Sequence, residues 1–540
     1  MRLPSMKYAD GITKSKQVVF GGLNHSAGAG DGELWDMKNL TSDHHPVLAS
    51  RQTRRLYKTL SSGGGLFSWE GLCWVDGTSF FFRGEEKGKV TPGKKNFASL
   101  GSYILIFPDK CYYNIDTGEF GSMEARWQGT KLTFGNGLLY GEEAAANCIS
   151  CEGVKWAEYF RSGDAVTVSG CTAVPENNKS LIIRSIDGDK LYFYEYSFTL
   201  KGEATSYNED GKLEISRTVP DLQFVCEHEN RLWGCAENTI YASKLGDFFN
   251  WNVYDGLETD AFAVNTGSAG DVTGCISYRG YATFFKEDHI YKVYGSVPSN
   301  FQVLGSATLG LAQGSENSLA VAGETLFYLS RNGVMAYTGG IPQPVGHAFG
   351  KLRFQDAVGG SDGLKYYVSM RGHDGSWGLY VFDTQQGLWH REDSSCVIGF
   401  AKWDGNLYFL NDAGEIWITG NLQYVPDGTA EEEPVQWFAE FTDFTEKDPN
   451  KKGVSKIQIR LELDVGATVQ VWIQFDSDGV WQKVSSALGE GSKRSYYLPI
   501  IPRRGDHYRL KLTGTGGCRI YSMVREYYSG SEFRSTAGRN

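Results

Sequence analysis

Paired carboxylates are the side chains of this sequence whose types and spacing could do chemistry. Glu287-Asp288, Asp374 and Glu392-Asp393 each lie at the end of a strand-like segment. Two acids that face each other could cleave a glycosidic bond, one as general acid and the other as base or nucleophile. All three positions are also expected hairpin tips, where a solvated turn acid has the same appearance. We favour turn residues and leave the enzymatic interpretation open.

Metal, redox and phosphate sites have weaker signals. Cys148 and Cys151 form one CxxC pair without a second pair, and the 10 scattered cysteines indicate buried thiols in a reducing cytosol. His44-His45 precedes a proline, as in a surface turn. Gly63-Gly64-Gly65 is predicted to be a turn, because no Gly-Lys-Ser/Thr follows it. We therefore assign no catalytic, cofactor-binding or metal residues and expect no cofactor.

Two further motifs do not by themselves indicate a function. Residues 476–481 approach the Asp-box of sialidase propellers, but Ser477 stands where the aspartate is required. The densest basic stretch contains Arg51, Arg54, Arg55 and Lys58, and a shorter one is Pro502-Arg503-Arg504. Such a run is typical of a solvated strand face as well as of a DNA contact.

Composition restricts the class of protein. The net charge of −11 argues against a sequence-specific DNA reader, which is usually basic, and suits a conduit that repels DNA. The first 10 residues have no apolar segment typical of a signal peptide, and the longest apolar runs, such as residues 103–107, are too short to span a membrane. We expect no membrane insertion.

The elements that carry these residues are short strands joined by tight turns. Aromatic residues make up 14 % of the chain and there are 67 glycines, a combination that suits pleated strands and positive-φ turns. Asn332-Gly333 between two alternating segments is a strong hairpin signal. Seven stretches share this pattern: residues 66–82, 99–113, 224–242, 275–294, 319–338, 360–382 and 397–418. A doubtful eighth lies near residues 134–140.

The spacing of these stretches between residues 275 and 418 is about 40–45 residues, which is typical of four-stranded propeller blades. We predict an all-β protein: a β-propeller of about seven blades with an inserted small β domain and a C-terminal β-sandwich. The expected domains are an N-terminal arm and ring-closing segment at 1–62, the propeller at 63–146 and 223–420, the insertion at 147–222, the sandwich at 435–528 and a flexible tail at 529–540. Residues 427–434 are expected to be an acidic linker.

Several segments resemble one family of viral proteins. Residues 35–51 have an aromatic residue, Asn39-Leu40-Thr41-Ser42, and then Pro46 and Leu48. Residues 380–393 have Asp383-Thr384, a turn, and then Gly387, Trp389 and Glu392-Asp393. These patterns resemble the packaged-DNA stabilisation, tail nozzle and tail tubular proteins of short-tailed bacteriophages, and residues 495–502 and 519–529 look similar to their C-terminal domain.

The resemblance implies a structural protein and not an enzyme. It implies a virion tail subunit, assembled in the host bacterial cytoplasm, that forms a ring of six copies below the portal and adaptor. The ring would retain and conduct double-stranded DNA and support tail fibres or spikes. Two alternatives stay open: a receptor- or glycan-binding propeller at the tail tip, and a polysaccharide-degrading propeller whose two carboxylates lie roughly 5–10 Å apart.

Overall fold

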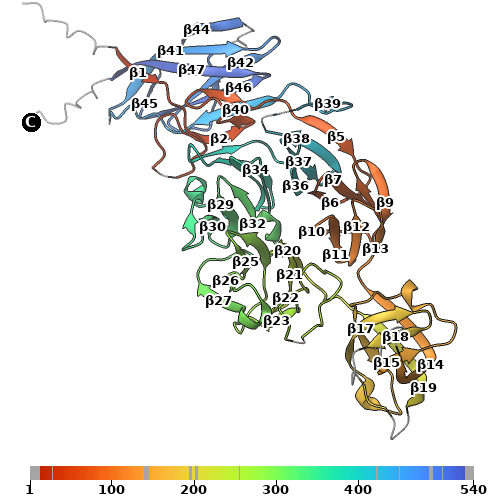
Figure 1. Cartoon of the computed structure of the whole chain (residues 1–540). Helices are drawn as coiled ribbons and strands as arrows, with labels where there is room; N and C mark the ends of the chain where they lie inside the picture. Colours follow the sequence, from red (N-terminus) through yellow and green to blue (C-terminus); the bar gives the residue numbers. More distant parts are fainter. Residues whose placement is uncertain are drawn as a thin grey trace, which may run out of the picture. The chain divides into compact units, whose positions relative to one another are not determined.

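The protein is built of β-strands (Figure 1). The computed structural model describes residues 12–26, 28–138, 145–193, 198–200, 205–254, 256–420, 422, 424–448, 450–485, 491–501 and 503–529. Within these ranges the only helical segments are short 3₁₀ turns: η1 (Trp156–Glu158), η2 (Pro175–Asn177), η3 (Pro298–Asn300), η4 (Glu316–Ser318) and η5 (Gly346–Phe349). None of the helices in the described part of the chain is long and apolar enough to cross a membrane.

Seven sheets, six of four strands and one of five, follow one another along the chain. They are β6 (Gly63–Ser68), β7 (Leu72–Asp76), β8 (Ser79–Phe82) and β9 (Glu85–Lys89); β10 (Asn96–Leu100), β11 (Tyr103–Phe107), β12 (Cys111–Asn114) and β13 (Phe120–Ser122); β20 (Phe224–His228), β21 (Arg231–Ala236), β22 (Thr239–Ala242) and β23 (Phe262–Asn265); β24 (Gly274–Tyr278), β25 (Tyr281–Phe285), β26 (His289–Tyr294) and β27 (Gln302–Ala307); β28 (Ala320–Ala322), β29 (Thr325–Ser330), β30 (Gly333–Tyr337) and β31 (Gln343–Pro344); β32 (Phe354–Ser361), β33 (Lys365–Gly372), β34 (Trp377–Asp383) and β35 (Leu388–Arg391); and β36 (Val397–Trp403), β37 (Asn406–Asn411) and β38 (Glu415–Thr419) with β5 (Arg55–Thr59), which also carries β39 (Ala430–Glu431).

This topology is that of a seven-bladed β-propeller, so the predicted fold class and blade number are confirmed. Each predicted strand–turn–strand stretch supplies strands of one blade. The turns have the expected chemistry: Asp404 and Gly405, with φ of 48° and 76°, join β36 to β37 in a tight hairpin. The last blade is completed by a strand from the other end of the chain, because β5 pairs with β38.

The chain divides into two compact units, residues 1–68 with 317–540 and residues 69–316. In the first unit, neighbouring blades pack through Phe327 and Tyr366, whose ring centroids are 5.2 Å apart. The predicted turn at Gly63-Gly64-Gly65 is wrong, because these residues begin β6. A Cβ atom on Gly63 would lie 2.9 Å from a methyl carbon of Leu410, so the glycine permits close strand packing and is not needed for a turn.

In the second unit a closed barrel interrupts the blades. It is formed by β14 (Ala125–Leu138), β15 (Ala145–Ser150), β16 (Ala165–Ser169), β17 (Ser180–Asp187), β18 (Lys190–Phe193) and β19 (Ser206–Arg217). The insertion therefore starts earlier than the predicted residue 147, and residues 134–138 are not an eighth blade. The reason is that β14 pairs with β19, about 80 residues later, and not only with its chain neighbour.

The barrel has its own core and a charged anchor. Trp127 and Trp156 meet edge to face inside it, with ring centroids 5.0 Å apart. Arg217 pairs with the buried Asp164 and lies 4.7 Å from the ring centroid of Phe249, in the loop after β22. The ion pair fixes Arg217 within the barrel, and its cation–π contact joins the barrel to a propeller loop of the same unit.

The β-sandwich belongs to the first unit and uses both ends of the chain. One sheet contains β3 (Leu40–Thr41), β4 (Leu48–Ser50), β47 (Cys518–Ser529), β41 (Lys452–Leu463) and β44 (Gly491–Pro499), with β1 (Thr13–Gln17) on β47 and β45 (Arg504–Gly505) on β41. The other contains β2 (Leu34–Lys38), β40 (Gln436–Phe441), β46 (Tyr508–Thr515), β42 (Thr468–Phe475) and β43 (Gln482–Lys483).

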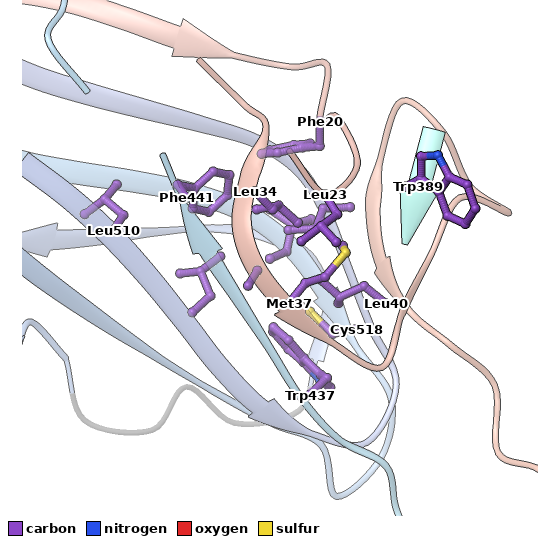
Figure 2. Packing of buried hydrophobic residues seen from close by; sticks show 14 of the residues in the cluster. Phe20, Leu23, Leu34, Met37, Leu40, Trp389, Trp437, Phe441, Leu510 and Cys518 are labelled. Atoms are coloured by element: carbon purple, nitrogen blue, oxygen red, sulfur yellow. The ribbon is translucent and has the colours of Figure 1, made fainter. Parts of the chain in front are cut away.

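The N-terminal segment expected to be an arm is therefore part of the sandwich core. Figure 2 shows Phe20, Leu23 and Met37 packed among Trp437 and Phe441 of the C-terminal half, and all five side chains are buried. Blade residue Trp389 joins the same cluster. Of the expected flexible tail, residues 530–540 lie outside the described residues.

Candidate functional site: the interlock between the N-terminal segment and the sixth blade

Two of the segments that carry the family resemblance, residues 35–51 and 380–393, meet in space, although about 340 residues separate them. The Asn39 backbone N–H donates to the Glu392 carbonyl at 2.6 Å. The Ser42 hydroxyl donates to the Asp383 carboxylate at 2.6 Å, and both side chains are buried. Asp383 also accepts hydrogen bonds from the N–H groups of Gln385 and Gln386, so it shapes the turn after β34. We call this contact region the interlock.

Arg54 is the central charge of the interlock. Its guanidinium donates to Glu392 at 2.5 Å and to Asp393 at 2.6 Å, and only about 5 % of the Arg54 side chain is exposed. Burial by itself would raise the pKa of Asp393, but the charge of Arg54 and hydrogen bonds from Ser395 lower it to about 2. The pKa of Arg54 is raised, because its two carboxylate partners outweigh its desolvation.

The acidic segment at 427–434 adds a second ion pair. Arg51 binds Glu432 through two nitrogens, at 2.7 and 2.8 Å, and donates from Nε to the Asn39 amide oxygen at 2.8 Å. Burial opposes ionisation of Glu432, yet the Arg51 hydrogen bonds lower the pKa of this carboxyl. Arg55 pairs with the more exposed Glu431 at 2.8 Å. The predicted linker is thus tied to the N-terminal segment by charge.

These ion pairs determine whether the densest basic stretch, residues 51–58, is free to contact DNA. Three of its four basic residues, Arg51, Arg54 and Arg55, are used in internal ion pairs, and Lys58 is exposed on β5. A bidentate arginine–carboxylate pair leaves little of the guanidinium free for a phosphate. The basic stretch is therefore a structural element of the fold, and the alternative that it contacts DNA has no support in these residues.

The candidate carboxylates all have local partners. Asp393 with a pKa of about 2 is ionised near neutral pH and cannot act as a general acid there. Asp374 accepts from the Ser376 N–H and hydroxyl at 3.0 and 2.7 Å, in a turn. Glu287 accepts from the Gln313 N–H at 3.2 Å, and Asp288 pairs with His289 at 2.9 Å. Each acid is explained by its turn or its ion pair.

The cysteine candidates lie in the barrel, and the histidine candidates lie in a turn of the sandwich. Cys148 packs against Tyr192 in the barrel, and Cys151 donates to the Lys131 carbonyl. Burial raises the pKa of both thiols. His44-His45 lies in the turn between β3 and β4. In the described part of the chain no three His, Cys, Asp or Glu residues are placed to hold a metal ion.

The remaining motifs lie in the sandwich. The Asp-box-like segment is the turn between β42 and β43, where Asp476 accepts from the Asp506 N–H at 2.6 Å. Asp478 accepts from Arg503 at 2.9 Å, so one residue of the shorter basic stretch is also paired internally. Arg504 lies in β45, and Pro502 is outside the described residues.

Sequence reasoning did not place Ser42, Asp383 and Glu432 in the interlock. The signal was present, since Ser42 and Asp383 are positions of the two family-like motifs. The sequence did not show that these two motifs lie next to each other in the folded chain.

The comparisons with known proteins bear on the fold. No family model matches the chain, and no curated protein matches it. Similar solved structures include BamB from Moraxella catarrhalis, 9 % identical over 70 % of this chain and 99 % of that one, with a TM-score of 0.33. The WD40 repeats of RRP9 are 7 % identical over 71 % and 99 %, with a TM-score of 0.28. An exo-β-1,3-galactanase from Phanerochaete chrysosporium is 9 % identical over 55 % and 96 %, with a TM-score of 0.21. We base the fold on the strand topology and take no functional conclusion from these similarities.

Proposed function

We propose that this protein is a virion structural protein of a tailed bacteriophage, a propeller subunit of the tail nozzle that retains and conducts genomic DNA. The supporting observation is the interlock. Five of the motif residues that suggest the family have architectural contacts: Asn39 and Ser42 on one side, and Asp383, Trp389 and Glu392 on the other. Side chains that join chain segments suit a rigid wall element.

The charge distribution of the interlock also supports a structural role. Buried ion pairs such as Arg54–Glu392 fix one arrangement, because breaking them leaves a charge without a partner. In this proposal copies of the chain form a ring through their lateral propeller faces, and the portal or adaptor and the tail fibres or spikes are the further partners.

The test is the oligomeric state of the purified chain, alone and mixed with a phage head–tail connector, measured by mass photometry. We expect a closed ring of about six copies, or ring formation only on the connector. A monomer or trimer that ignores the connector and binds host cells would overturn the proposal in favour of a receptor-binding propeller. Release of sugars from a host polysaccharide would overturn it in favour of an enzyme.

A further inference from the structure

One face of the β-sandwich is unusually basic. In the sheet that contains β41 and β47, alternate residues point away from the buried core. The outward positions of β1, β41, β44 and β47 carry six cations and two tyrosines, and we call them the basic face: Lys14, Lys16, Lys456, Arg460, Lys493, Arg519, Tyr497 and Tyr521. Figure 1 shows the four strands in one layer.

The strand register brings these residues into rows. Lys14 pairs with Glu526, which pairs with Lys456 on the next strand. Lys16, Val524, Gln458 and Tyr497 form the neighbouring row across four strands. Because adjacent strands are about 4.8 Å apart, Lys14 and Lys456 lie two strands, or about 10 Å, apart in their row, with Glu526 between them.

The basic face is not neutralised from within. The four strands contain only two carboxylates, Glu462 and Glu526. Glu526 lies 3.0 Å from Lys14 and 4.0 Å from Lys456, and Glu462 accepts the Tyr521 hydroxyl at 2.6 Å. Six cations against two carboxylates leave an excess of four positive charges, in a chain whose net charge is −11.

The other sheet of the sandwich provides the contrast. Two of its outward cations are paired with acids: Lys511 lies 3.3 Å from Glu440, and Arg509 pairs with both Glu440 and Asp443. The strands of that sheet carry four cations against two carboxylates, Asp36 and Glu440. Their excess of two positive charges is half that of the basic face.

Aromatic rings lie between the cations. Tyr497 is 60 % exposed, and the Lys456 ammonium is 4.6 Å from its ring centroid. Lys493 lies over the ring of Tyr521 in the same way. Cation–π contacts hold the ammonium groups close to the sheet, and an exposed tyrosine offers a ring face and a hydroxyl to a ligand.

We propose that the basic face binds the sugar–phosphate backbone of DNA without sequence preference. Charge complementarity identifies a polyanion, and the exposed Tyr497, whose hydroxyl can donate to a phosphate oxygen, favours nucleic acid over an acidic protein surface. The inference rests on the proposed function for its biological setting, in which DNA passes the protein. The binding itself does not require a ring.

The experiment measures binding of the full chain to a fluorescent duplex of about 20 base pairs by anisotropy, between about 50 and 200 mM salt. We expect salt-dependent binding that the double variant R460E/K493E weakens at least about tenfold, with a smaller salt slope. The matched control K131E/K212E makes the same charge change at two exposed residues of the barrel, on β14 and β19, and is expected to change the affinity less than about twofold. Circular dichroism melting verifies that the variants are folded.

Two outcomes would overturn the inference. One is DNA affinity that does not differ between the wild type and R460E/K493E. The other is binding of polyglutamate with the same affinity and the same loss in the variant, which would identify an acidic protein surface as the partner. A wild-type chain that forms no ring but binds DNA through the basic face would refute the nozzle and leave this inference standing.

Discussion

At the scale of single residues, charge in this protein serves architecture. Arg54, Glu392 and Asp393 form a buried triad, and Arg51 and Glu432 form a second pair beside it. Burial makes such groups costly when they are alone, so each depends on its partner.

Replacing Arg54 by methionine should strongly destabilise the first unit, because two buried carboxylates lose their cation. We expect a loss of about 3–5 kcal/mol in the free energy of unfolding, measured by denaturant titration. R55M is the control, since Arg55 pairs with a half-exposed glutamate, and should cost less than about 1 kcal/mol. Equal effects of the two variants would refute the special role of the triad.

Acidification should weaken the first unit through His390. Burial, with a contribution from Lys365, lowers the pKa of this histidine to about 4, against 6.5 in an unfolded chain. Between these values the unfolded chain binds more protons, so the stability falls as the pH falls from 6.5 to 4, by at most about 3 kcal/mol. Protonation of Asp393 lowers the stability further only below about pH 4, because its pKa in the folded protein is about 2.

The measurement is the melting temperature of the wild type and of H390Q at several pH values between 7 and 4. Glutamine does not titrate, so the variant should show a flatter pH dependence in this interval. Parallel curves for the two proteins would show that His390 is not the group responsible.

At the scale of elements, the propeller depends on one strand from outside its own sequence. β5 lies between β38 and β39, and its Leu56 pairs with Trp417 on one side and Ala430 on the other. A ring of sheets needs this closure, because the last blade otherwise ends at β38 with an open edge.

Replacing Leu56 by proline should open this blade, since proline removes a backbone N–H and is excluded from central strands. We expect L56P to lower the free energy of unfolding by roughly 2 kcal/mol more than L56A does, because alanine shortens the side chain but keeps the backbone N–H. Hydrogen exchange of β38 and β39 measures the effect. If both variants exchange alike, the backbone pairing of β5 is not what holds the blade closed.

At the scale of the whole molecule, the two ends of the chain fold together. The strands β1 to β4 lie within the two sheets of the sandwich, and buried residues of the N-terminal segment, such as Leu34 and Met37, share one core with β40 and β46. Neither end has a complete core without the other.

A chain that lacks residues 1–62 should therefore fail to fold in its first unit, because the sandwich loses β1 to β4 and the last blade loses β5. We expect insoluble protein, and recovery of soluble protein when residues 1–62 are co-expressed as a separate fragment. Soluble yield and tryptophan fluorescence measure both results. A soluble truncated chain with native fluorescence would contradict the shared core.

Sequence alone was sufficient for features that depend on neighbouring residues. The alternation in residues 325–337 and the positive-φ pair Asp404-Gly405 specify hairpins locally, so the number of blades and the fold class could be predicted. The sequence could also indicate that residues 35–51 and 380–393 matter, because they resemble known motifs.

Only the tertiary structure decided which distant segments pair. β14 extends to 14 residues because β19 lies beside it, and Gly63 is in a strand because Leu410 leaves no room for a side chain. Arg54 has the same local pattern as an exposed strand residue, yet it is buried between two acids more than 330 residues away. Ion pairs and strand pairs of this kind carry no periodicity along the chain, since their partners are brought together by burial of the whole core.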